Sequence, residues 1–304
     1  MRVFLTRKED NMSIKKVGLL IDDIGESWIA ERLARKEKDV IVVCQQEEQL
    51  PLIQQDIEKA LDRRIARYAI TISEKKVILS RIHYHVDLHA LNDADLVVES
   101  INGNMVEKKD LFKQLEEMLE ETTILATNSI TNRVSDIQKD AVFPERIIGL
   151  HFIYHAVEII KGNQTHDQTY ETIFDFMEKM NVFICHVKEA PGYAFSRITF
   201  TFFNEAVEVL AEGLTTAEEL DQMLKSSFEW RLGLLEMADR IGLDEIFQQL
   251  QELYEETKNS KYLPSPYLGQ LVSEGKIGVR SGEGFFTYRD DGKRLVKVGE
   301  GGSR

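Results

Sequence analysis

Three histidines stand close together in the segment HYHVDLH, at positions 83, 85 and 89. Alternation along a strand would put His83 and His85 on the same side, and two imidazoles on one side of a strand can bind a metal ion. His89 follows four residues later. The sequence does not identify a carboxylate or thiol that completes a ligand set, so we expect surface histidines and no metal.

A second candidate is a pair of basic residues in the segment ALDRRIARYAITISEKK. Arg63 and Arg67 are one helical turn apart, which places both guanidinium groups on one helix face, where they can bind phosphate. The alternative is a solvated basic face whose charge is balanced by Asp56, Glu58 and Asp62.

The histidines and arginines lie in a part of the chain where predicted strands and helices alternate. Short apolar, β-branched runs predict strands at 15–21, 39–44, 81–88, 94–100, 122–128 and 146–154. The highly charged residues 47–81 and the amphipathic residues 106–121 are typical of helices. Strand, turn, helix and strand in this order form a βαβ unit, so we predict a Rossmann-type, doubly wound α/β sheet.

Beyond residue 189 the strand pattern stops. Amphipathic helical runs follow at 193–212, 216–226, 232–239 and 243–258. The predicted domains are an α/β domain at 14–189 and an all-helical domain at 190–304, joined near Pro191 and Gly192. Residues 1–13 are interpreted as an extension outside the fold, because Met12 directly precedes the first strand and residues 1–11 read as an upstream-start or vector-derived segment.

Composition excludes several classes of partner. The 304 residues include 38 basic and 52 acidic side chains, a net charge of −14, which argues against nucleic acid and anionic membranes. No run approaches the roughly 18 apolar residues of a membrane span. Two cysteines, Cys44 and Cys185, indicate neither a disulfide framework nor a zinc knuckle. We therefore expect a cytoplasmic protein.

A series of motifs in fixed order makes the pattern specific. They are ADLVVESI (94–101), EKKDLF (107–112), ATNS (126–129), PERIIGLHF (144–152), EIIKG (158–162), APGY (190–193), SR (196–197), NEAVEVLAEG (204–213), LLEMADRIGLD (234–244), PSPYLGQLVSEGKIG (264–278) and SGEGFFTY (281–288). With them the chain resembles the short-chain 3-hydroxyacyl-CoA dehydrogenases, including the 3-hydroxybutyryl-CoA dehydrogenases. The resemblance covers roughly residues 15–288.

The resemblance implies oxidation of an (S)-3-hydroxyacyl-CoA to a 3-oxoacyl-CoA, with hydride passing to NAD and the proton to a histidine. That histidine is His151 in GLHF, and the carboxylate that orients it is Glu158 in VEIIKG. Histidine suits a general base near neutral pH. The alternative is that both residues only belong to consecutive strands. Tyr154 and His155 replace the Asn-Pro of the family in a shorter connection.

The cofactor turn departs from the family pattern. The three glycine positions of its dinucleotide fingerprint fall on Ile21, Asp23 and Glu26, although glycines there let the backbone approach a pyrophosphate. Carboxylates at this turn also oppose phosphate at a helix N-terminus. The resemblance leaves five candidate NAD contacts: Asp22, Gly25, Gln45, Lys108 and Asn128.

Two further NAD positions of the family have changed. Its acidic ribose ligand corresponds to Cys44, which also reads as a half-buried strand residue, and a usual glutamate corresponds to Gly103. Lys108 keeps its place in EKKDLF, and a solvated helix face explains it equally well.

The substrate side is changed as well. The family's substrate-hydroxyl serine corresponds to Ile130, so Ser129 and Thr131 are the candidates after a local shift. Its active-site asparagine corresponds to Ser196. Arg63 and Arg67 lie in the helical hairpin that receives CoA in the family.

These observations leave alternative functions open. One is an NAD-dependent dehydrogenase without a metal, which acts on acyl-CoA and forms a homodimer through its helical domain. Another is a non-catalytic or repurposed acyl-CoA-binding paralogue that has lost NAD. A related enzyme of carrier-bound hydroxyacyl groups is a third possibility that needs the same cofactor.

Overall fold

The computed structural model describes residues 13–22, 24–101, 103–130, 133–289 and 291–295. Asp23, Thr131 and the proposed extension up to residue 12 lie outside these ranges. The chain divides between Ala190 and Pro191 into two compact units. The predicted fold class is confirmed, because unit 1 is a Rossmann-like α/β layer structure and unit 2 is helical.

One sheet forms the centre of unit 1. Within the described ranges its eight strands have the order β3-β2-β1-β4-β5-β6-β7-β8. The strands are β1 (Lys16–Ile21), β2 (Asp39–Val43), β3 (Ile82–His85), β4 (Leu96–Ser100), β5 (Ile124–Thr127), β6 (Ile147–Ile153), β7 (Ala156–Lys161) and β8 (Phe183–Lys188). All neighbouring pairs are parallel except β6 and β7. The strand order reverses between β1 and β4, and ligands of such sheets bind beyond the carboxyl ends at this point.

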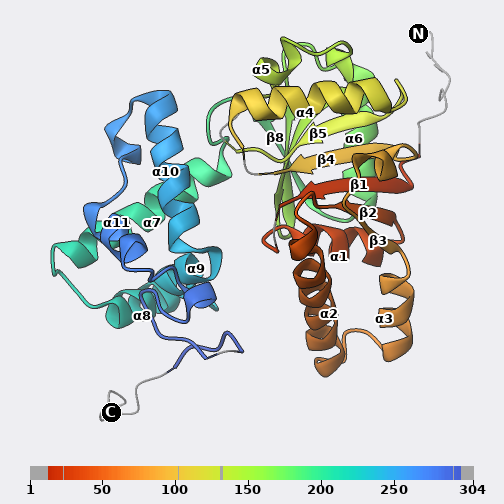
Figure 1. The fold of residues 1–304 in the computed structure, drawn as a ribbon. Coiled ribbons are helices and arrows are strands. Elements are labelled where there is room, and N and C mark those ends of the chain that lie inside the picture. Colours follow the sequence, from red (N-terminus) through yellow and green to blue (C-terminus); the bar gives the residue numbers. More distant parts are fainter. Residues whose placement is uncertain (1–12, 23, 102, 131–132, 290, 296–304) are drawn as a thin grey trace, which may run out of the picture. The chain divides into compact units, whose positions relative to one another are not determined.

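Helices cover both faces of the sheet. They are α1 (Ser27–Arg35), α2 (Leu50–Ala66), α3 (Ile72–Leu79), α4 (Met105–Met118), α5 (Val134–Gln138) and α6 (Asp167–Lys179), with short 3-10 turns η1 (Glu47–Gln49), η2 (Leu88–Leu91) and η3 (Pro144–Arg146). Figure 1 shows α4 on one face and α1 on the other. The apolar side chains of α1, α2 and α6 pack with those of β1 and β2 in one core cluster.

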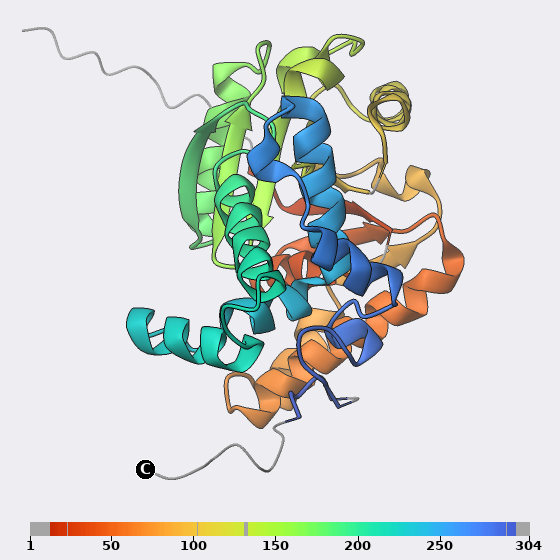
Figure 2. The same cartoon turned by 90° about the vertical axis from the view of Figure 1, so that its left-hand side faces the viewer.

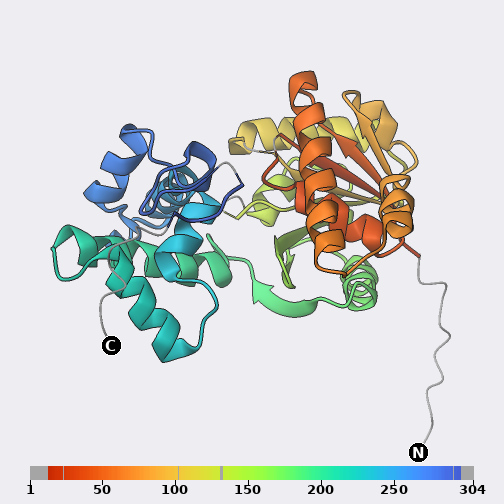
Figure 3. The ribbon, with the colours of Figure 1, turned by 90° about the horizontal axis from the view of Figure 1, so that it is seen from below.

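Most of residues 47–81 are helical, as we expected. They form two helices, α2 and α3, which pack beside α1 (Figure 3). The chain reverses at Tyr68, whose φ is +56°. The Thr71 side chain then caps α3 by accepting the backbone N–H of Glu74, a favourable way to start a helix.

Unit 2 contains α7 (Phe195–Ala211), α8 (Ala217–Phe228), α9 (Leu234–Ile241), α10 (Leu243–Thr257) and α11 (Pro266–Ser273), with the 3-10 turns η4 (Ser260–Tyr262) and η5 (Val279–Ser281). Its own apolar core joins α7, α9, α10 and α11. Figure 2 shows α7 and α10 side by side. None of the described helices has the length and apolar character that crossing a membrane requires.

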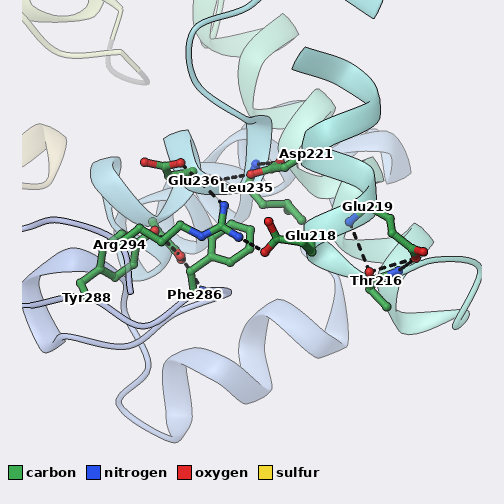
Figure 4. A network of polar contacts seen from close by, with 10 residues as sticks. Thr216, Glu218, Glu219, Asp221, Leu235, Glu236, Phe286, Tyr288 and Arg294 are labelled. Carbon is green, nitrogen blue, oxygen red and sulfur yellow. Dashed lines mark hydrogen bonds and ion pairs between the residues drawn. The ribbon is translucent and has the colours of Figure 1, made fainter. Parts of the chain in front are cut away.

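The segment after α11 is fastened to α9 by a buried carboxylate. Asp239 is 1% exposed and accepts the backbone N–H groups of Phe285 and Phe286 and the hydroxyl of Tyr288. The guanidinium of Arg294 lies over the Phe286 ring, 3.4 Å from its centroid (Figure 4). These contacts hold residues 285–288, which we call the strap, against α9.

Candidate active site

The β6–β7 hairpin places a histidine and a glutamate directly opposite each other. His151 pairs with Glu158 in the antiparallel register, and only Tyr154 and His155 connect the two strands. His151 Nδ1 and Glu158 Oε2 are 2.7 Å apart. The shorter connection therefore brings the two side chains together, because it continues the ladder without a slip.

Burial and hydrogen bonding define the chemistry of this pair. His151 is 6% exposed and Glu158 2%. An ionised carboxylate only accepts hydrogen bonds. The Nδ1–H group of His151 therefore donates a hydrogen bond to Glu158, and Nε2 is the proton acceptor of the neutral ring. When Nε2 gains a proton, the carboxylate stabilises the imidazolium. The arrangement is that of an oriented general base.

A buried ion pair lies at the carboxyl end of β4. Lys108 Nζ is 2.5 Å from Glu99 Oε1 and donates to the backbone oxygen of Ile101. The Thr127 hydroxyl donates to Glu99 Oε2. Lys108 is 5% exposed and Glu99 0%, so the solvated-face explanation of Lys108 is wrong. Since α4 packs this lysine onto the sheet, the carboxylate must compensate its charge.

Sequence reasoning missed Glu99. Its signal was available, since a glutamate at the end of the buried run ADLVVES needs a partner once the strand is covered on both faces.

Asn128 connects three neighbouring strands at the same edge. Its Oδ1 accepts the backbone N–H of Phe152, and its Nδ2 donates to the hydroxyl of Ser100. Asn128 is 8% exposed. Ser129, the next residue, is half-buried, and its backbone N–H donates to the Thr127 hydroxyl. The amide of Asn128 thus anchors the residue that follows His151.

The dinucleotide turn combines features that favour and oppose a phosphate. Helix α1 begins after β1 at the reversal of strand order, and the side chain of its N-cap residue, Glu26, makes no capping hydrogen bond. The Ser27 hydroxyl donates to Asp56. A helix N-terminus attracts phosphate, whereas the carboxylates of Asp22 and Glu26 repel it. Gly25 is exposed between them.

A hollow lies beside the end of β2. Cys44 is 1% exposed, and its thiol donates to the backbone oxygens of Asp22 and Gln46. It is therefore fully buried, and our expectation of a half-buried residue is wrong, because its thiol turns inward between the two turns. Gln45 is exposed and lines a hollow of about 520 Å³ together with residues 86–89 and the last turns of α4.

The two arginine candidates lie on the exposed end of the α2–α3 hairpin. Arg63 and Arg67 are both exposed. Two of the carboxylates expected to balance them have other partners, since Asp62 pairs with Lys75 at 2.6 Å and Asp56 binds α1. The guanidinium groups thus face solvent at the tip of this hairpin.

We call His151 and Glu158 the dyad. The remaining candidates lie on β3, at an edge of the sheet far from the dyad, or in unit 2. His83 and His85 are exposed on β3, and the described residues contain no cluster of three or more His, Cys, Asp or Glu side chains suited to a metal. Ser196 lies in the first turn of α7 in unit 2 and is 1% exposed.

Comparison with known proteins covers nearly the whole fold. The family model described as "3-hydroxyacyl-CoA dehydrogenase, NAD binding domain" matches residues 24–190. A second, "3-hydroxyacyl-CoA dehydrogenase, C-terminal domain", matches residues 192–288. Together they cover far more than half of the chain. The first match begins after β1, within the turn that leads to α1.

Individual relatives agree with the family models. A probable 3-hydroxybutyryl-CoA dehydrogenase of Deinococcus radiodurans is 34% identical over 265 residues, which are 86% of this chain and 95% of the relative. The 3-hydroxybutyryl-CoA dehydrogenase of Bradyrhizobium diazoefficiens is 31% identical over 281 residues, 91% of this chain and 96% of the relative.

A solved structure has the same architecture. The (S)-3-hydroxybutyryl-CoA dehydrogenase of Ralstonia eutropha superposes with a TM-score of 0.79 at 29% identity and covers 91% of this chain and 100% of that chain. The sequence motifs, the two-unit fold and these matches agree, and the chain belongs to the 3-hydroxyacyl-CoA dehydrogenase family.

Proposed function

We propose that this protein is an NAD-dependent dehydrogenase that interconverts (S)-3-hydroxyacyl-CoA and 3-oxoacyl-CoA. The observation that carries the proposal is the buried contact of 2.7 Å between His151 Nδ1 and Glu158 Oε2. A histidine oriented in this way can exchange a proton with the 3-hydroxyl of the substrate. Family membership supports the same reaction.

His151 and Glu158 have separate roles in the proposed mechanism. When bound, NAD supplies the acceptor for the hydride that leaves C3. His151 takes the hydroxyl proton at Nε2 as the C3–O bond gains double-bond character. Glu158 keeps the ring in the required tautomer and stabilises the positive charge that forms on it. In the reverse direction His151 returns the proton to the carbonyl oxygen.

The first turn and the end of β2 are the proposed cofactor site. Backbone amides at the start of α1, next to Asp22 and Gly25, would hold the pyrophosphate, and Gln45 would hydrogen-bond a ribose. Lys108 and Asn128 have side-chain partners within unit 1. We therefore assign them the support of this edge and no direct charge contact with the cofactor.

Two basic residues of unit 1 are proposed to bind the substrate. Arg63 and Arg67 would bind CoA phosphates, because both are exposed and two of the nearby carboxylates are engaged elsewhere. Ser129 and Thr131 are the candidates for binding the substrate hydroxyl, and Ser196 is the candidate at the position of the family's active-site asparagine. Acyl-CoA is the substrate class expected from the family.

The proposal also includes an oligomeric state and a cellular compartment. We expect a homodimer formed through unit 2, where exposed apolar side chains include Ile198, Met223 and Phe228. We also expect the protein to lie in the cytoplasm.

A steady-state assay tests the reaction. Purified protein should oxidise NADH in the presence of acetoacetyl-CoA, measured by the loss of nicotinamide absorbance. His151→Asn should lower kcat by about 10²–10⁴-fold, because a general acid–base group contributes that much. Equal NADH binding by the variant is the control for folding. Equal rates for both proteins, above a no-enzyme blank, would remove His151 from the reaction.

A further inference from the structure

The tip of the β6–β7 hairpin has an unusual residue at a constrained position. Tyr154 has a φ of +31°, and tight hairpin turns with positive φ favour Gly, Asn or Asp. A tyrosine there costs about 1 kcal/mol. Its side chain is also 68% exposed, so burial does not explain its presence.

A ring contact does explain it. The Tyr154 ring stacks on the indole of Trp28, with centroids 5.0 Å apart and planes at 19°. Trp28 is the second residue of α1, and the Phe152 ring meets it edge-on at 6.4 Å and 78°. An aromatic pair contributes about 0.5–1.5 kcal/mol, which is enough to offset the backbone cost at the tip.

This cluster contacts the hairpin from the side opposite the dyad. Consecutive side chains of a strand point to opposite faces, so Phe152 and His151 lie on different faces of β6. The backbone of Phe152 is held from another direction by Asn128.

Register links the tip to the dyad. Ile153 pairs with Ala156 and His151 with Glu158 in one ladder. A slip of one residue at the turn would move the two side chains of the dyad apart and onto different faces. A contact that fixes the turn therefore also fixes the distance between His151 and Glu158.

We propose that Trp28, Phe152 and Tyr154 form an aromatic brace that holds the His151–Glu158 hairpin in register and ties it to α1. These are positioning residues. The inference rests on the proposed function, since it places the start of the dinucleotide-binding helix in direct contact with the catalytic hairpin. Both elements lie in unit 1, so the brace acts within one compact unit.

Two substitutions at Tyr154 isolate the ring. Tyr154→Phe keeps the stack, whereas Tyr154→Gly removes the ring and also relieves the positive φ. A matched control is Tyr68→Gly, because Tyr68 also has a positive φ, +56°, and is 97% exposed, yet it has no ring contact among the described residues. Trp28→Leu removes the other half of the stack.

Proton NMR gives a readout that does not depend on turnover. A histidine Nδ1 proton bonded to a carboxylate resonates far downfield, and His151→Asn identifies the signal. We expect it in wild type, Tyr154→Phe and Tyr68→Gly, and we expect it lost or exchange-broadened in Tyr154→Gly and Trp28→Leu. In the assay, Tyr154→Gly should lower kcat about 10-fold or more at little-changed KM, since small misplacements of reacting groups are costly.

The two readouts separate the brace from the proposed function. An unchanged downfield signal and unchanged kcat in Tyr154→Gly would overturn the brace while wild-type turnover stands. If wild type has no turnover, the proposed function fails, and the NMR comparison still decides whether the rings hold the hairpin.

Discussion

Lys108 and Glu99 show how much one buried charge depends on its partner. The lysine is the side chain that family resemblance assigns to the cofactor, yet its ammonium is bound to Glu99 Oε1 and to the backbone oxygen of Ile101. Thr127 binds the second carboxylate oxygen. The pair therefore holds β4, α4 and β5 together at the edge where the proposed cofactor site lies.

Lys108→Met should destabilise the protein by about 3–5 kcal/mol, because it leaves the Glu99 carboxylate buried without a countercharge. Urea denaturation followed by circular dichroism measures the loss. The double variant Glu99→Gln/Lys108→Met should recover most of it, since no isolated charge remains. A single-variant loss below about 1 kcal/mol would contradict this account of the pair.

Glu158→Gln tests the second member of the dyad. The amide keeps the size of the side chain but removes its charge and, by donating to the ring, favours the wrong tautomer. We expect kcat to fall by about 10²–10⁴-fold, as for the loss of a histidine-orienting carboxylate in other enzymes, with little change in the unfolding temperature. Normal kcat in this variant would show that the carboxylate does not orient His151.

The sequence identifies His151 and Glu158 but not the contacts around them. Motif position alone places the two residues, and their distance depends on the hairpin register. Glu99 and the Trp28–Tyr154 stack escape sequence reasoning because each joins segments far apart in the chain. For Lys108 the sequence also allows an exposed position, because EKKDLF has the pattern of an exposed helix, whereas the side chain is buried.

At the scale of elements, periodicity predicts most of unit 1 and four helices of unit 2. It does not separate α2 from α3, because the reversal at Tyr68 uses a left-handed tyrosine with no glycine or proline to mark it. It also gives no prediction of α6 or β8. Strand β8 is only partly buried along its length, so the alternation that marks a covered strand is weak there.

The strap along α9 gives a pH dependence to the stability of unit 2. Burial raises the pKa of Asp239 to about 6, although three hydrogen bonds oppose this shift and the nearby Asp221 adds to it. The folded state thus binds this proton more tightly than the unfolded state. The stabilisation is complete below the ordinary value of 3.8 and is lost as the pH rises to about 6.

Comparison with Asp239→Asn measures this contribution, because the amide cannot ionise. The difference in unfolding free energy, wild type minus variant, should fall by about 2 kcal/mol between pH 4.5 and 7, since one pKa unit corresponds to about 1.4 kcal/mol. Denaturant titrations at several pH values give the curve. A difference that stays constant over this range would rule out titration of Asp239 as its source.

At the scale of the whole molecule, the family models match both units but begin only at residue 24. Strand β1 and the first residues of the turn after it thus lie outside the matched range, while most of unit 1 and most of unit 2 lie inside it. Fold and family were predictable from motif order. Cofactor use was not, because backbone amides bind phosphate and the sequence does not display their geometry.

Unit 2 should form a homodimer. Exposed apolar side chains on α7 and α8, including Ile198, Met223 and Phe228, are expected to be covered by a second copy. Size-exclusion chromatography with light scattering should give about 70 kDa, twice the chain mass of 35.0 kDa. A single species near the mass of one chain at micromolar concentration would contradict the dimer.

Titration with NADH tests the central claim most directly. If the turn after β1 holds the cofactor, nicotinamide fluorescence should rise to saturation at micromolar NADH, and Glu158→Gln should bind equally well because it does not alter the turn. No enhancement, together with measurable binding of acetoacetyl-CoA, would contradict the account and identify an acyl-CoA-binding protein without nicotinamide chemistry.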